Sequence, residues 1–255
     1  MLNILITGHR GFIGQHMVNA LSDHNLSFYD WGSTYPTIDN LDWVIHLGGI
    51  SSTTETNIEK IMMQNYDFSC WLLDQCIAKQ VNFQYSSSAS IYGLKTEFTE
   101  SSPVDPRTPY AWSKYFFENY ASKQSGIIIQ GFRYFNVFGK HEDHKGSQAS
   151  PYHQFSKQAA NGLIKIFKDS NNFYRDFVPV EIVCRAHKLF LNVKDSGIFN
   201  IGTGVATSFY DIAKTFHVPI EEIDMPTNLI HSYQKYTCAD MTKTNNALNN
   251  IGEKL

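Results

Sequence analysis

Two residues of one predicted helix have the types and spacing needed to exchange a proton with a substrate. Tyr110 and Lys114 are four residues apart in a segment that Thr108 and Pro109 open. They therefore lie on one helical face with their side chains close together. A phenol with a pKa near ~10 is a poor base at neutral pH. A neighbouring ammonium and a cationic cofactor favour its phenolate, so the pair predicts a proton-transferring tyrosine. By itself, this spacing is more often an ordinary surface turn.

A second group that could do chemistry is a cluster of glycines near the N-terminus. The apolar run 2–7 predicts a buried strand, Gly8, Gly11 and Gly14 follow it, and a helical pattern begins there. The next predicted strand, 26–29, ends at Asp30. Glycines let the backbone approach a pyrophosphate, the helix N-terminus attracts it, and the acid accepts hydrogen bonds from a ribose. Strand, glycine turn, helix, strand and acid together predict a dinucleotide-binding unit.

The elements that must position these groups alternate along the chain. Residues 43–47 and 81–85 predict further buried strands, and 57–79 has the apolar spacing of a long helix. Ser88, within SSSASIYG, follows the strand 81–85 and so stands at its carboxyl end, where open α/β sheets bind ligands. The alternation predicts an α/β fold with a Rossmann-type, doubly wound parallel sheet.

Composition narrows the class of protein. The 255 residues are 42% hydrophobic with a formal net charge of −3, which favours a globular protein and argues against a nucleic-acid partner. No apolar run approaches a membrane span, no leader is evident, and the four cysteines form no CxxC pair. We therefore expect a soluble, cytoplasmic protein without a membrane partner. The segment 141–144 (HEDH) lacks the spacing of a metal site, so we expect an exposed polar loop and no metal.

These motifs resemble those of the extended short-chain dehydrogenase/reductases, and within them the ADP-glyceromanno-heptose 6-epimerases. The resemblance covers nearly the whole chain. The glycine turn with Tyr110 and Lys114 identifies only the superfamily, whereas HKGS after RYFNVFG is more specific. The matching segments are SSTTE (51–55), GFRYFNVFG (131–139), HKGS (144–147) with Ala149 and Ser150, NFxRDFV (172–178), GIFNIGTG (197–204) and Tyr233 with Gln234.

The resemblance implies inversion at C6 of an ADP-heptose through a transient ketone. Hydride would leave the sugar for a nicotinamide cofactor, NADP with NAD possible, and return to the opposite face. Inversion is served by two proton-handling groups on opposite sides of the carbon. The match implies Tyr110 and Lys145 in these roles, with Ser88 orienting the reacting oxygen. Lys114 would hold the nicotinamide ribose and lower the pKa of Tyr110.

The resemblance also implies two sets of binding residues. For the nucleotide sugar they are Ser88, Asn136, Ser147, Gln154, Phe167, Arg175 and Tyr233, where an arginine offers a donor fork suited to a diphosphate. For the cofactor they are Gly8, Arg10, Gly11, Phe12, Ile13, Gly14, Asp30, Trp31, Leu47, Gly48, Gly49, Ser51, Tyr110, Lys114, Val137 and Lys145.

Three segments depart from the family pattern. Between Asp30 and Trp43 there is room for little more than a turn, where the family has a strand, a helix and a lysine for the NADP phosphate. Asp30 would repel that phosphate, and Arg10 is the cation available to replace the lysine. Pro179 replaces a residue with a backbone donor, and no helix-capping acid follows it. The family's last helix has no counterpart after Tyr233 and a short polar helix.

Several alternatives stay open at this point. The chain could be an epimerase or reductase acting on a different nucleotide sugar, or a cofactor-binding regulator without turnover. Dehydratase chemistry is disfavoured, because Ala89 and Ser90 follow Ser88 where dehydratases carry an acid pair. We expect a cofactor domain over 1–136, completed by about 177–202, and a small substrate-binding C-terminal lobe over 137–255. A homo-oligomer is possible.

Overall fold

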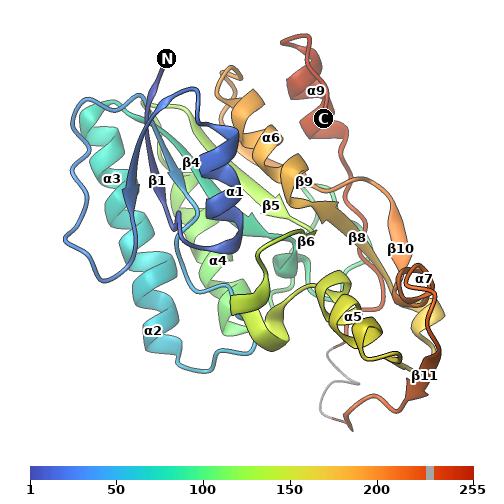
Figure 1. Ribbon diagram of the computed structural model, residues 1–255. Coiled ribbons are helices and arrows are strands. Elements are labelled where there is room, and N and C mark those ends of the chain that lie inside the picture. The colour runs from blue at the N-terminus through green and yellow to red at the C-terminus, as the bar shows by residue number, and fades with distance from the viewer. Residues whose placement is uncertain (228–232) are drawn as a thin grey trace.

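A six-stranded parallel sheet forms the centre of the computed structural model, which describes residues 1–227 and 233–255 apart from the side chain of Ser147 (Figure 1). The strand order is β2-β1-β3-β4-β5-β9, and every neighbouring pair is parallel. This arrangement confirms the expected Rossmann-type α/β fold. The strands are β1 (Asn3–Thr7), β2 (Asn25–Tyr29), β3 (Trp43–His46), β4 (Asn82–Ser88), β5 (Ile129–Tyr134) and β9 (Gly197–Ile201).

Helices cover both faces of this sheet, because alternate residues of each strand point to opposite sides. Ile4 and Ile45 pack with α1 and α6 on one face. Leu5 and Val44 pack with α3 and α4 on the other. The sheet is therefore doubly wound, as expected. The helices on it are α1 (Phe12–Ala20), α3 (Phe68–Lys79), α4 (Pro109–Ala121) and α6 (Val180–Phe190), and α9 (Thr242–Asn249) packs beside β9.

The predicted helix 57–79 is present but carries a π-helical turn. It consists of α2 (Ile58–Met62), the π-turn η1 (Met63–Asp67) and α3. The wider turn directs Asn65 inward, where its Nδ2 donates to Ser113 Oγ at 3.0 Å. The Asn65 side chain also exchanges two hydrogen bonds with the backbone of Ile50. The π-turn therefore joins α4 to the segment that follows β3.

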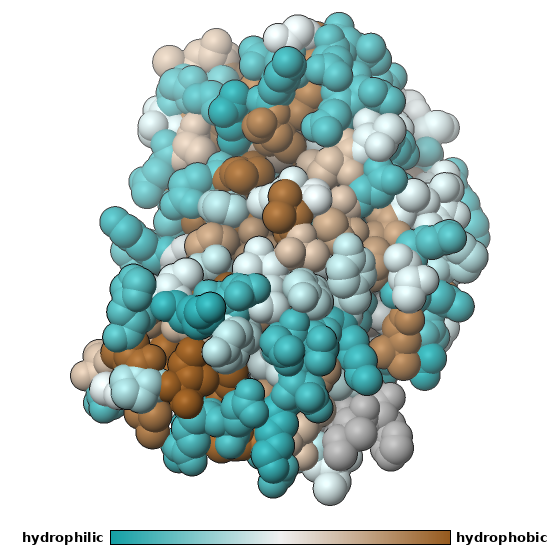
Figure 2. All heavy atoms as spheres, turned by 90° about the vertical axis from the view of Figure 1, so that its right-hand side faces the viewer, coloured by the Kyte–Doolittle hydropathy of each residue, from teal (hydrophilic) through white to brown (hydrophobic). Residues whose placement is uncertain are grey.

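A smaller lobe contains two short sheets. Its first sheet has the order β10-β8-β6 and its second pairs β7 with β11. Figure 2 shows that this side of the molecule is mostly hydrophilic, with hydrophobic residues gathered in separate areas. The elements are β6 (Asn136–Phe138), β7 (Ile164–Phe167), β8 (Tyr174–Pro179), β10 (Ala206–Ser208), β11 (Ile220–Ile223), α5 (Pro151–Ala160) and α7 (Phe209–Lys214), with 3-10 turns η3 (Asp143–Gln148) and η4 (Ser170–Asn172). A further 3-10 turn, η2 (Ala89–Tyr92), directly follows β4 of the central sheet.

The segment 30–42 contains no helix or strand, which leaves β2 at the edge of the sheet. Aromatic packing takes the place of the missing elements. The Tyr35 ring lies 4.5 Å from that of Trp71 and 5.2 Å from that of Phe68, and Ile38 is buried in the same cluster. The shortening expected from the sequence is thus confirmed, and this end of the sheet is covered by side chains of α3.

Within residues 1–227 and 233–255, no helix has the length and apolar character needed to cross a bilayer. No three His, Cys, Asp or Glu side chains gather there as metal ligands. The four cysteines are all free.

A buried ion pair fastens α4 to the sheet. Arg133 on β5 donates from Nη2 to Glu118 Oε2 at 2.7 Å, and from Nε to Oε1 at 3.0 Å. Ser87 at the end of β4 donates to the same carboxylate at 2.5 Å. Both charged side chains are only 5% exposed, so each carries a desolvation cost that the other offsets. The pair therefore sets the distance between α4 and the carboxyl end of β4.

We predict that Arg133→Met lowers the free energy of unfolding by about 3–5 kcal/mol, because it leaves Glu118 buried without its cation. The double variant Arg133→Met/Glu118→Leu should recover most of that loss. Urea unfolding of the three proteins measures both effects. A loss below about 1 kcal/mol in the single variant would show that the pair does not fasten the helix.

Candidate active site

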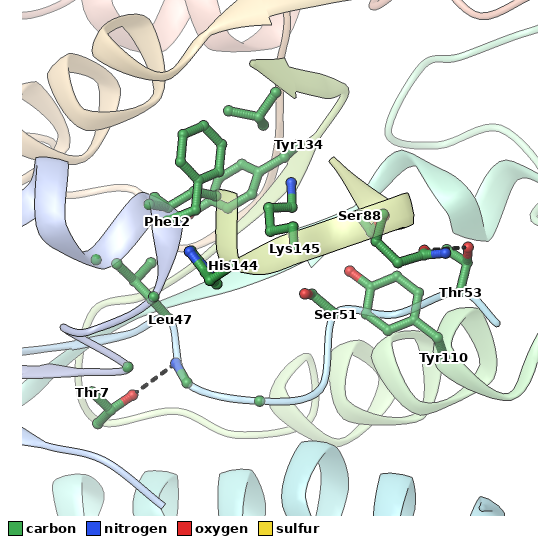
Figure 3. A pocket seen from close by; sticks show the side chains of 18 of the residues that line it. Thr7, Phe12, Leu47, Ser51, Thr53, Ser88, Tyr110, Tyr134, His144 and Lys145 are labelled. Atoms are coloured by element: carbon green, nitrogen blue, oxygen red, sulfur yellow. Dashed lines mark hydrogen bonds between the residues drawn. The ribbon is translucent and has the colours of Figure 1, made fainter. Parts of the chain in front are cut away.

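A cavity of about 690 Å³ lies where the carboxyl ends of β1, β3, β4 and β5 meet (Figure 3). Parallel strands end at one edge of the sheet, so their following loops share this space. Sixteen predicted residues line the cavity: Gly8, Gly11, Phe12, Ile13, Gly14, Asp30, Trp31, Leu47, Gly48, Gly49, Ser51, Ser88, Tyr110, Asn136, Val137 and Lys145. The structure thus brings most of the predicted cofactor residues together with three of the predicted catalytic ones.

The glycine turn fits a pyrophosphate. Gly8 has φ +73°, and a Cβ there would lie 2.7 Å from Gly48, so the two loops can meet only without that side chain. A Cβ on Gly14 would lie 2.1 Å from the Gly8 carbonyl oxygen. Helix α1 begins at Phe12 with no side-chain cap and no acid in its first turn. Its free N–H groups and positive dipole end are therefore available to an anion in the cavity.

Asp30 follows β2 and lines the cavity. Its Oδ2 lies 3.0 Å from His9 Nδ1 and 3.3 Å from Arg10 Nε. The Arg10 side chain is 82% exposed and does not line the cavity, unlike Asp30 and Trp31. Arg10, predicted as a cofactor contact, is therefore turned toward the acid in this structure.

Tyr110 lies in the first turn of α4, where Thr108 caps the helix by accepting from Ala111 N. Burial raises the pKa of the Tyr110 phenol, and a side-chain hydrogen bond with Ser88 acts in the opposite direction. This result differs from the lowering that we expected from Lys114. The Lys114 ammonium lies 5.9 Å from the centre of the phenol ring and donates to the Ser86 carbonyl at 3.0 Å.

Lys114 does not line the cavity. It is 8% exposed, and burial lowers its pKa to about 8, with the negative charge of Glu118 acting against that shift. Its Nζ lies 3.9 Å from the position that a Cβ on Gly49 would occupy. A Cβ at Gly49 would thus lie in van der Waals contact with the Lys114 ammonium, and it would lie only 2.7 Å from Asn65 Oδ1.

Lys145 reaches the cavity from η3, whereas Tyr110 reaches it from α4 (Figure 3). The Lys145 Nζ lies 4.8 Å from the centre of the Phe12 ring and 3.2 Å from Glu142 Oε2. The expectation of an exposed polar loop is wrong for Glu142, which is fully buried. Its neighbours Gly139 and Ser150 donate to it, and these bonds draw the acid inward.

Two loops meet at the mouth of the cavity. Gln148 of η3 exchanges hydrogen bonds with Thr53 and Thr54, which follow β3, at 3.4 and 3.2 Å. Sequence reasoning named neither Thr53 nor Gln148 as a site residue, although Thr53 lies in a segment that carried the family resemblance and Gln148 lies between two such segments. The other lining residues that it missed are Thr7, Tyr29, Gln64, Phe68, Ser87, Tyr134, Phe135, His144, Ala149, Ser150 and Pro151. Their position at the carboxyl end of a parallel strand could have indicated Ser87 and Tyr134.

Four predicted substrate residues lie outside this cavity. Arg175 on β8 is held between the rings of Phe209 and Tyr233, with its guanidinium carbon 5.4 and 5.3 Å from their centres. Phe167 packs edge-on against Tyr233, while Gln154 donates to the Gly146 carbonyl at 2.8 Å. The side chain of Ser147, also predicted, is outside the described part of the structure.

We predict that Lys114→Met makes the ligand-free protein more stable by about 1–3 kcal/mol at pH 7, because no buried ammonium remains. The pKa of about 8 in the folded protein lies below that of the unfolded chain. The gain is therefore full below pH 8 and vanishes as the pH rises to about 10.5. Thermal unfolding across this range measures it, with the exposed Lys123→Met as control. A less stable variant at pH 7 would contradict this account.

Comparison with known proteins gives the family of this fold and site. The family model described as "NAD dependent epimerase/dehydratase family" matches residues 4–202. A UDP-N-acetylglucosamine 4-epimerase from Methanobrevibacter ruminantium M1 is similar with a TM-score of 0.87 and 24% identity, over 99% of this chain and 92% of that one.

Two other solved structures are similar at comparable levels. The ADP-L-glycero-D-manno-heptose-6-epimerase of Helicobacter pylori gives a TM-score of 0.85 at 24% identity, over 97% of this chain and 90% of that one. The UDP-glucose 4-epimerase of Thermotoga maritima gives 0.84 at 26%, over 97% and 93%. With a family match over most of its length and a complete cavity at the strand ends, the chain is an enzyme that belongs to the NAD dependent epimerase/dehydratase family.

Proposed function

We propose that this enzyme inverts C6 of an ADP-glycero-manno-heptose by transient oxidation to a ketone. The observation that carries the proposal is the meeting of Tyr110 and Lys145 in one cavity from two separate elements. Inversion needs the reacting oxygen to find a proton acceptor or donor in each of two orientations. A single tyrosine would suffice for a simple reductase.

The chain's own residues have distinct tasks in this reaction. A bound nicotinamide would accept a hydride from the sugar carbon and return it to the opposite face. Ser88 orients the hydroxyl beside Tyr110, which takes its proton during oxidation. After the ketone has turned, Lys145 donates a proton to its oxygen as the hydride returns. Solvent then restores the starting protonation of both side chains.

The identity of the sugar is the least constrained part of the proposal. The Helicobacter pylori heptose epimerase shares the fold, and so do epimerases named for UDP-sugars. The HKGS segment (144–147) supports an ADP-heptose as the substrate. It is the motif that resembles the heptose epimerases, and its Lys145 lines the cavity. An epimerase acting on a different nucleotide sugar is the alternative. The alternative of a regulator without turnover is not supported, because the chain belongs to an epimerase/dehydratase family.

For the cofactor, NADP was the sequence-based expectation, with NAD possible, and we propose that NAD is preferred. Asp30 lines the cavity at the end of β2, where a ribose hydroxyl can donate to its carboxylate. The same carboxylate would repel a 2′-phosphate. Arg10, the cation that could offset this repulsion, is already paired with Asp30 at 3.3 Å.

We also propose that the cofactor domain spans 1–136 with 177–202, and that 137–255 mainly holds the nucleotide sugar. The placement of α6 beside α1 and of β9 in the main sheet supports this division. A homo-oligomer and a cytoplasmic location stay predictions from the sequence.

We predict that Tyr110→Phe and Lys145→Met each reduce inversion by at least ~10²-fold while the cofactor stays bound, because each removes one proton-handling group. The test incubates each protein with ADP-D-glycero-β-D-manno-heptose and follows the C6 configuration by NMR. Full activity of Lys145→Met would show that the lysine is not the second group. Wild-type protein that holds cofactor but inverts no ADP-heptose would favour another nucleotide sugar.

For cofactor choice, we predict that Asp30→Asn weakens NAD binding about tenfold and strengthens NADP binding, since the charged acceptor is replaced by a neutral one. Calorimetric titration with each dinucleotide measures both affinities, and the exposed Asp23→Asn serves as control. Tighter binding of NADP than NAD by the wild-type protein would contradict the preference.

A further inference from the structure

The segment 139–150, between β6 and α5, is organised around one carboxylate. Glu142 is fully buried and accepts four hydrogen bonds. Gly139 N and Ser150 Oγ donate to its Oε1 at 3.1 and 2.7 Å. Ser150 N and Lys145 Nζ donate to its Oε2 at 2.7 and 3.2 Å. A carboxylate has about four acceptor positions, so this set is complete.

The first three of these bonds fix the acid independently of the lysine. Gly139 follows β6 and Ser150 caps α5, so Glu142 ties the two ends of the segment together. Burial by itself would raise the pKa of Glu142, but the bonds from Ser150 and the charge of Lys145 lower it overall. The acid is thus an anion held in place by backbone and serine donors.

Among the donors to Glu142, Lys145 has the longest and most flexible side chain. A lysine side chain loses much of its rotamer entropy when it is held in one place. Here the ammonium lies between the fixed Glu142 carboxylate at 3.2 Å and the Phe12 ring at 4.8 Å. Phe12 begins α1 in the cofactor domain, so these two contacts hold the ammonium at the junction with the small lobe.

We propose that Glu142 is the positioning residue that holds the Lys145 ammonium in the cavity for proton transfer. It does not itself line the cavity and acts through Lys145. The proposal rests on the proposed function and assigns a role to a residue outside the Tyr110, Lys145 and Ser88 set. Misplacing a reacting group by about 1 Å can cost ~10²-fold in rate.

The test exploits the two halves of the reaction. Oxidation of one C6 epimer uses Tyr110, and oxidation of the other uses Lys145. Wild-type, Glu142→Gln, Glu142→Asp and Asp143→Asn proteins are loaded with oxidised cofactor and mixed with each C6 epimer separately. The absorbance of reduced nicotinamide reports the oxidation half-reaction, and NMR reports inversion. Asp143 is the matched control, because it is the neighbouring acid and its side chain is 79% exposed.

We expect Glu142→Gln to slow inversion by about 10²-fold and to slow cofactor reduction by one epimer only. Reduced cofactor should accumulate with the other epimer, whose oxidation depends on Tyr110. Glu142→Asp, which keeps the charge with a shorter reach, should show the same asymmetry at smaller size. Asp143→Asn should match the wild type.

Equal slowing with both epimers would overturn the proposal, because a merely structural role of Glu142 would impair both halves alike. If Glu142→Gln fails to fold, equal slowing in Glu142→Asp would overturn it in the same way. Failure of the wild-type protein to invert either epimer would instead reject the proposed function.

Discussion

Parallel pairing of β1, β3, β4 and β5 is the constraint on which the site depends, because it brings four strand ends to one edge of the sheet. The ends are also fixed to one another. Thr7 Oγ1 lies 2.7 Å from His46 Nδ1, and the Gly48 amide donates to the same hydroxyl at 3.0 Å. The glycine turn and the segment after β3 are therefore held together before any ligand arrives. The other residues that line the cavity lie around the glycine turn and the segment after β3.

The proposed catalytic residues Tyr110 and Lys114 are held in a buried position. Tyr110 and Lys114 are almost fully buried, and burial opposes the charged form of each side chain. The ion pair of Glu118 and Arg133 anchors the helix that carries them. Burial disfavours the phenolate of Tyr110. The positive charge of a bound oxidised nicotinamide would favour that phenolate.

How far the sequence predicts this structure depends on how local each signal is. The glycine turn, Asp30 and the pair Tyr110 and Lys114 follow from short patterns, and the parallel sheet follows from their alternation. The π-turn that directs Asn65 inward has no such pattern. Glu142 sits in a polar stretch, and its burial depends on Gly139 and Ser150 closing around it. Arg175 contacts the rings of both Tyr233 and Phe209, and none of the three lines the cavity. Local sequence cannot show this arrangement, because the three residues are distant along the chain.

The central claim is that a hydride leaves the sugar carbon and returns to it within one active site. The most direct measurement is the epimerisation of ADP-heptose in deuterated water, followed by NMR of the product. We predict inversion at C6 with the original hydrogen still attached to that carbon, because solvent exchanges protons only with Tyr110 and Lys145. Deuterium at C6 of the inverted product would contradict it.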